Sequence, residues 1–205
     1  MSNRLSFIKK DLLTEVGTIG TGNAASALAG LVGKKITINV PRVDIVPFSA
    51  VARLVGGGDQ VKACIFLDVH GDLPGTVLVL FDRKTAEELL SALIPGSRVK
   101  FFSLTPLEES ALNEIGNILS GAYLSALADF TGKTMLSGLP TLAVDIVEAV
   151  LSVPMTKLGP ASDVALLIQA TFFEEQKHSG SILYIPDQGV DQRLLDVFGV
   201  VDNGR

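Results

Sequence analysis

The chain repeats itself, and this duplication constrains its fold more than any other feature. The stretch EVGTIGTGNAASALAGLVGKKITINVP at 15–41 aligns without a gap with EIGNILSGAYLSALADFTGKTMLSGLP at 114–140, and eleven of the 27 aligned positions are identical. Further along, GTVLVLFD at 75–82 aligns with GSILYIPD at 180–187. The two halves are therefore expected to fold alike and to be related by a pseudo-two-fold axis.

Each half predicts a long helix, then strands, then a closing helix. In the second half the helix starts at the N-cap candidate Thr105, with Pro106 at its first position and Glu108 completing a capping box, and Gly132 ends it. The corresponding helix of the first half is expected over residues 6–31. The strand-like runs are KITINV, AVARLV, VKACIFLDV and GTVLVLF in the first half and TLAVDIVEAVLSV, DVALLIQATFF and GSILYI in the second, and the closing helices are expected at 83–94 and 190–200.

This order of elements favours an α/β fold of the α+β kind. We expect a largely antiparallel sheet with helices packed on one face, because short turns such as HGDLPG and KHSG join the strands. No stretch has the composition of a disordered linker, so residues 1–205 are expected to form one domain with internal repeats at about 6–100 and 105–205. A duplicated chain supplies its own internal symmetry, which favours a monomer.

Composition and charge exclude several classes of protein. The 205 residues carry a net charge of −5 with no basic cluster, which argues against a nucleic-acid partner. The apolar stretches are too short and too charged to span a membrane, and the opening residues lack the pattern of a signal peptide. Cys64 is the one cysteine and is expected in the core, so a reducing cytoplasm is the expected location.

The glycines at 17, 20, 22 and 30 raise the question of a phosphate-binding loop. The second copy has Leu119 and Asp129 in place of Gly20 and Gly30, and no strand precedes the first copy as the dinucleotide fingerprint requires. We therefore interpret these glycines as small residues that let another helix or backbone approach closely. Binding of a nucleotide is the weakest of the alternatives.

A row of polar residues marks the helix of the second half. Ser110, Glu114 and Asn117 are spaced by four and three residues, which places them on one face, and Pro140 follows further on. Polar residues on a helix face are commonly no more than solvated. However, Gly116 and Asn117 are poor residues for the middle of a helix, and such exceptions tend to occur at functional positions. The corresponding positions in the first half hold Asp11, Glu15, Thr18 and Pro41.

The doubled pattern resembles the CheC family of chemotaxis phosphatases, whose relatives include CheX and the flagellar switch protein FliY. The match rests on Ser110, Glu114, Asn117 and Pro140, on the strings EIGNI and SALADF, and on a layout with two motifs, which is similar to CheC rather than to single-site CheX. The resemblance covers almost the whole chain. It implies hydrolysis of the phospho-aspartate of the response regulator CheY, in which Asn117 orients the attacking water and Glu114 pairs with a lysine of the regulator.

The same resemblance implies that the protein needs no cofactor of its own, because the divalent metal, such as Mg²⁺, belongs to the regulator. The sequence shows no metal-ligand cluster. In the first copy Thr18 replaces the asparagine, and Asn23 does not lie at the motif spacing. We therefore expect Asn117 to do most of the catalysis and Glu15 and Thr18 to form a degenerate second site.

Two alternatives remain open at the level of sequence. One is a binding module that sequesters the phosphorylated regulator or regulates the receptor deamidase CheD. The other is a flagellar switch component similar to FliY. The complete Ser110, Glu114 and Asn117 row favours an enzyme, whereas the threonine at position 18 favours binding.

Overall fold

The computed structural model describes residues 2–33, 36–158, 164–172, 178–190 and 193. Within these residues the elements follow in the order α1 (Ser2–Val32), β1 (Ile38–Pro47), the 3₁₀ turn η1 (Phe48–Ala50), α2 (Val51–Leu54), β2 (Val61–Gly71), β3 (Gly75–Asp82), α3 (Arg83–Leu93), α4 (Pro106–Thr131), β4 (Met135–Ser137), β5 (Thr141–Ile146), α5 (Val147–Leu158), β6 (Val164–Phe172) and β7 (His178–Pro186). None of the described helices has the length and apolar character that crossing a membrane requires.

The strands form one sheet in the order β1-β6-β7-β3-β2-β4, and β5 pairs with β2 next to β4. Every pairing between these strands is antiparallel, which confirms the predicted kind of sheet. Strands of each half pair with strands of the other half, because β1 lies beside β6, and both β4 and β5 lie beside β2. The two halves therefore share one sheet.

The centre of the sheet shows the duplication directly. There β3 pairs with β7, and Leu78 lies opposite Leu183. These two leucines correspond to each other when GTVLVLFD is aligned with GSILYIPD. The pseudo-two-fold axis thus passes between them, as the repeat predicts, while the outer bounds of the repeats stay a prediction.

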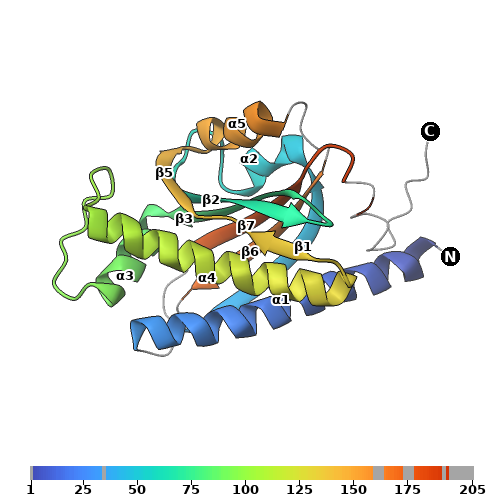
Figure 1. Ribbon diagram of the computed structural model, residues 1–205, viewed down its shortest axis with the longest axis horizontal. Coiled ribbons are helices and arrows are strands. Elements are labelled where there is room, and N and C mark those ends of the chain that lie inside the picture. Colours follow the sequence, from blue (N-terminus) through green and yellow to red (C-terminus); the bar gives the residue numbers. More distant parts are fainter. Residues whose placement is uncertain (1, 34–35, 159–163, 173–177, 191–192, 194–205) are drawn as a thin grey trace.

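Helices cover both faces of the sheet (Figure 1). The long helices α1 and α4, with α3, lie on one face over a large core that includes Ile65, Val79 and Phe81. The short helices α2 and α5 lie on the other face over a smaller core that includes Cys64 and Leu78. Successive residues of a strand point to opposite faces, so strands between two helical layers are apolar at nearly every position. Cys64 is fully buried, as predicted, and burial raises the pKa of its thiol.

Two segments differ from their predicted state. AVARLV forms α2 rather than a strand, and the run after β5 turns into α5, which continues through Pro154 to Leu158. Short apolar runs rich in valine fit a buried helix as well as a strand, and periodicity cannot separate the two. These helices provide the second layer, for which the sequence had predicted no helix. The expected closing helix at 190–200 falls almost entirely outside the described residues.

The two long helices pack against each other in opposite directions (Figure 1). A methyl group added at Gly20 of α1 would lie 2.7 Å from the ring of Tyr123 in α4, so the glycine is needed for this close approach. The Tyr123 hydroxyl lies 2.8 Å from Thr21 Oγ1, which in turn donates to the carbonyl of Gly17. Burial raises the pKa of Tyr123 to about 12, so the phenol remains a hydrogen-bond donor at neutral pH. Helix α1 runs unbroken past Gly20.

The predicted role of the glycines in packing therefore holds for Gly20 but not for Gly22 or Gly30, where an added methyl group would meet nothing within 4 Å. Gly20→Ala is expected to lower the free energy of unfolding by about 1–3 kcal/mol, because the ring of Tyr123 cannot move without separating the helices. Gly22→Ala is expected to raise it by up to about 1 kcal/mol through helix propensity alone. Urea unfolding of the two variants measures both effects. Equal changes in the free energy of unfolding of Gly20→Ala and Gly22→Ala would contradict the packing role of Gly20.

Candidate functional site

The polar row of the second half lies on the outer face of α4. Thr105 caps the helix in a complete capping box with Glu108, and Gly132 ends it in the left-handed conformation, as the sequence predicts. The apolar residues Leu112, Ile115 and Leu119 are buried on the inner face. Ser110 and Glu114 are exposed and Asn117 is half-buried. The helix therefore presents the row to solvent from a firmly packed support.

Gly116 determines how close Asn117 and its helix lie to the sheet. A methyl group added at Gly116 would lie 2.6 Å from Cγ2 of Ile65, a fully buried residue of β2. The absence of a side chain thus lets α4 lie directly on the strand. The sequence marked Gly116 as a poor residue for a helix interior, and the structure gives the reason.

Pro140 lies in the link between β4 and β5, and both of these strands contact α4. Leu142, two residues after Pro140, pairs with Ile65, the residue under Gly116. The Gly138 N–H donates to the carbonyl of Asp68 at 2.7 Å and holds the link against β2. The structure therefore brings Pro140 to the part of the sheet that lies beneath the middle of α4.

The side chains of Glu114 and Asn117 are available to a partner. Neither has a hydrogen-bond or ion-pair partner among the residues that the structure describes. An ionised carboxylate accepts hydrogen bonds, and a carboxamide both donates and accepts them. The two groups stand about one turn apart on the same side of the helix, so a single protein surface can meet both.

The corresponding site of the first half differs from the α4 row because the side chain at the asparagine position is hydrogen-bonded to its own helix. Glu15 and Thr18 are both exposed on α1. The Thr18 hydroxyl donates to the carbonyl of Thr14 in its own helix at 2.8 Å. Threonine on a helix commonly makes this bond to the backbone, and its hydroxyl is then committed to the helix. Asp11 and Pro41 lie in α1 and β1, and their side chains are outside what the structure describes.

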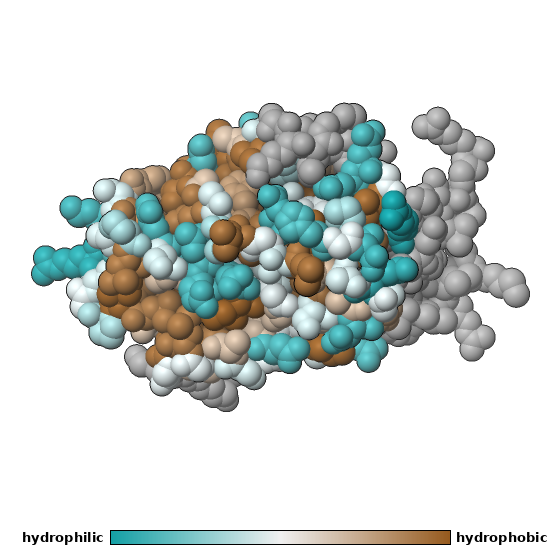
Figure 2. Space-filling view, in the orientation of Figure 1, coloured by the Kyte–Doolittle hydropathy of each residue, from teal (hydrophilic) through white to brown (hydrophobic). Residues whose placement is uncertain are grey.

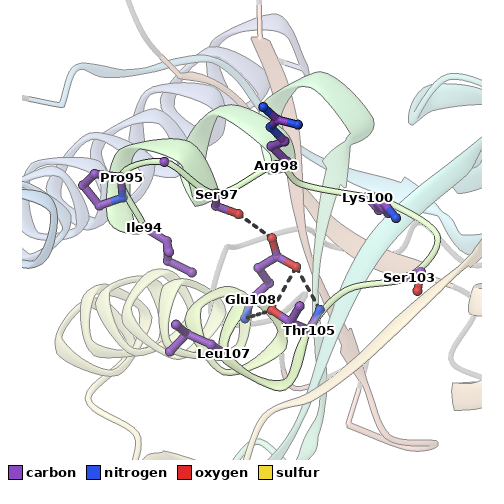
Figure 3. A pocket seen from close by; sticks show the side chains of 10 residues that line it. Ile94, Pro95, Ser97, Arg98, Lys100, Ser103, Thr105, Leu107 and Glu108 are labelled. Carbon is purple, nitrogen blue, oxygen red and sulfur yellow. Dashed lines mark hydrogen bonds between the residues drawn. The ribbon is translucent and has the colours of Figure 1, made fainter.

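A hollow of about 580 Å³ lies where α4 begins (Figure 3). Glu108 lies at its centre and accepts hydrogen bonds from the hydroxyl of Ser97 at 2.5 Å and from the N–H of Thr105 at 2.8 Å. These bonds lower the pKa of Glu108, the bond from Ser97 most of all, so the carboxylate stays charged. Since its oxygens are occupied in holding the loop before α4, we assign this hollow a structural role.

Among the described residues, no three His, Cys, Asp or Glu side chains gather closely enough to hold a metal ion. The candidate site is the α4 row, whose Asn117 and Glu114 offer a neutral amide and a carboxylate.

Comparison with known proteins identifies related chains. The model of the CheC-like family matches residues 8–45 and 107–138, the segments that contain most of α1 and of α4. The CheY-P phosphatase CheC of Bacillus subtilis is 32% identical over 194 residues, which cover 92% of this chain and 93% of that protein.

Two solved structures share the fold. FliY of Thermotoga maritima superposes with a TM-score of 0.68 at 20% identity, covering 93% of this chain and 95% of that one. In the CheX–CheY–BeF3–Mg+2 complex of Borrelia burgdorferi, the matched chain gives a TM-score of 0.55 at 14% identity and covers 86% of this chain and 98% of its own. With its two motif helices, its antiparallel sheet and a relative this similar along nearly the whole length, the chain belongs to the CheC-like family.

Proposed function

We propose that the protein hydrolyses the phospho-aspartate of a CheY-type response regulator in chemotaxis. The observation that carries the proposal is the contrast between the two motif helices. The Asn117 carboxamide has no partner within the described part of the chain, whereas the Thr18 hydroxyl is bonded to its own helix. A related protein from Bacillus subtilis is named a CheY-P phosphatase, which supports this reaction.

In the proposed reaction Asn117 acts on the attacking water. Its carboxamide oxygen accepts a hydrogen bond from a water molecule placed in line with the bond that breaks. The water oxygen bonds to phosphorus, the bond from phosphorus to the aspartyl oxygen breaks, and the products are inorganic phosphate and the free carboxylate of the regulator. Because the transition state of phosphoryl transfer is loose, positioning of the water is the main contribution that this chain can make. A neutral amide does so without placing negative charge beside the phosphoryl group.

Glu114 is proposed to dock the regulator rather than to take part in the chemistry. Its exposed carboxylate stands one turn before Asn117, where it can pair with a lysine of the partner. The divalent metal ion that neutralises the phosphoryl group is part of the substrate protein. Glu15 can dock a regulator in the same way at the first site, where Thr18 cannot orient water as asparagine does. We therefore assign binding without efficient turnover to the first site.

The experiment that tests this function measures phosphate release. A CheY-type regulator is phosphorylated with acetyl phosphate, the excess donor is removed, and phosphate is followed with and without the protein. A catalytic amount of the protein is expected to shorten the lifetime of the phosphorylated regulator over many turnovers. A protein that only sequesters the regulator would leave the lifetime unchanged or lengthen it in proportion to the amount added. That result would overturn the assignment as an enzyme.

A further inference from the structure

Leu139 is 90% exposed. It sits immediately before Pro140, in the link that enters the sheet beneath the middle of α4. Its side chain makes almost no contact with the protein, so its apolar character has no explanation in the folding of this chain. Single apolar residues are common on surfaces, and exposure alone would not assign a role to this leucine.

The backbone on both sides of Leu139 is held in place. On one side the N–H of Gly138 donates to the carbonyl of Asp68, and a methyl group added at Gly138 would lie 3.3 Å from that same oxygen. On the other side the ring of Pro140 restricts the backbone, and it restricts residue 139 as well. Leu139 is thus presented by a stiff link, and docking against it would cost little conformational entropy. This also gives a physical role to the proline of the motif.

A second exposed leucine lies at the other end of the polar row. Leu107 is 63% exposed and stands seven residues before Glu114, which places the two on the same face of α4. Figure 2 shows apolar side chains gathered at the end of the molecule where α4 begins, and polar side chains among them along the helix. The row of Ser110, Glu114 and Asn117 therefore has the exposed Leu107 at its N-terminal end, while the exposed Leu139 lies in the link between β4 and β5, the two strands that contact α4.

Resting on the proposed function, we propose that Leu139 and Leu107 are the apolar contacts that seat the regulator on α4. The partner is the face of the regulator that carries the phospho-aspartate, and it needs apolar side chains flanking that anionic pocket. Continuity with the polar row identifies this partner, since Leu107 shares a face of α4 with Glu114, and Leu139 lies three residues before Leu142, the partner of the Ile65 that lies under Gly116. Contacts at the edge of the interface exclude water from its centre, where hydrogen bonds and charges then act more strongly.

The test compares Leu139→Asp with Leu136→Asp. Leu136 is 60% exposed in β4, but it follows the buried Met135 of the core under α4 and so points to the opposite face of the sheet. Leu139→Asp is expected to raise the KM for the acetyl-phosphate-treated regulator by about tenfold or more with kcat unchanged, because an apolar contact is lost and a charge is desolvated. Leu107→Asp is expected to act in the same direction, and Leu136→Asp is expected to leave both constants unchanged. Because all three leucines are exposed, the urea midpoints of the three variants should match that of the wild type.

The outcomes separate this inference from the function on which it rests. If Asn117→Ala abolishes turnover while Leu139→Asp leaves KM unchanged, the docking role is wrong and the function stands. If the wild type itself gives no turnover, the function is wrong, whereas intact turnover in Asn117→Ala would overturn only the role of Asn117. A change in molar mass by light scattering with KM unaltered would assign Leu139 to contact between copies of this chain, which would also overturn the docking role.

Discussion

Asn117→Ala is expected to slow dephosphorylation of the regulator by about 100-fold or more while leaving its binding nearly intact. Removal of one well-placed hydrogen-bonding group from an active site commonly costs about 100-fold to 1000-fold in kcat. Misplacement of a reacting group by about 1 Å has a similar effect. Asn117 is half-buried and bonded to no described residue, so its truncation should leave the fold unchanged. Single-turnover phosphate release with the protein in excess measures the chemical step apart from binding.

Asn23→Ala is the matched control for this variant. Asn23 is exposed on α1, the helix of the other copy, but it lies eight residues after Glu15 rather than three. Asn23→Ala should leave the rate of dephosphorylation unchanged. If Asn23→Ala and Asn117→Ala slow the reaction equally, the motif spacing has no catalytic meaning.

Thr18→Asn in the Asn117→Ala background isolates the first site. An asparagine there removes the hydroxyl that now donates to the Thr14 carbonyl and restores the motif in α1. Partial recovery of turnover is expected, because Glu15 is already exposed in the docking position. No recovery, with the regulator still bound, would show that the first site lacks more than its asparagine.

The duplication made the fold predictable to a large extent. The two motif helices, the capping box at Thr105 and the sheet shared between the halves all follow from residue patterns that act locally or that occur twice. The helices α2 and α5 could not be predicted, because the runs that form them are short and β-branched and their state is decided by packing on the second face of the sheet. The roles of the glycines could likewise be predicted only in part. The sequence shows where each glycine occurs, but only the structure shows that Gly20 meets Tyr123 while Gly22 meets nothing.

The candidate site was predictable in its polar part only. The spacing of Ser110, Glu114 and Asn117 places them on one face whatever the tertiary structure. Leu139 gave no signal, since a leucine between glycine and proline reads as an ordinary turn residue. Its exposure depends on how the link between β4 and β5 lies against β2, which is a property of the whole sheet.

Gly116→Ala is expected to impair both stability and turnover, since this residue sets the position of its neighbour Asn117. The added methyl group would lie 2.6 Å from Cγ2 and 2.8 Å from Cβ of Ile65. Ile65 cannot retreat, because it is fully buried and its strand is paired on both sides, with Val79 and with Leu142. Helix α4 must therefore shift away from the sheet. The free energy of unfolding is expected to fall by about 1–3 kcal/mol, and kcat by about tenfold or more.

Gly121→Ala is the matched control for Gly116→Ala. Gly121 lies further along the same helix, and a methyl group added there would meet nothing within 4 Å. This variant should gain up to about 1 kcal/mol of stability from helix propensity and keep full activity. If it loses activity to the same extent, the effect of Gly116→Ala comes from altered flexibility of α4 rather than from contact with the strand.

Ile65→Ala combined with Gly116→Ala separates position from stability. The smaller strand residue removes both γ carbons that the new methyl group would meet but keeps Cβ, so α4 can return part of the way toward the sheet. Turnover should recover in part, although the double variant remains less stable than the wild type because core volume is lost. Recovery of kcat without recovery of the urea midpoint would attribute the defect of Gly116→Ala to the displacement of Asn117. If kcat instead follows the midpoint in every variant, the close packing at Gly116 serves stability alone and the site tolerates movement of its helix.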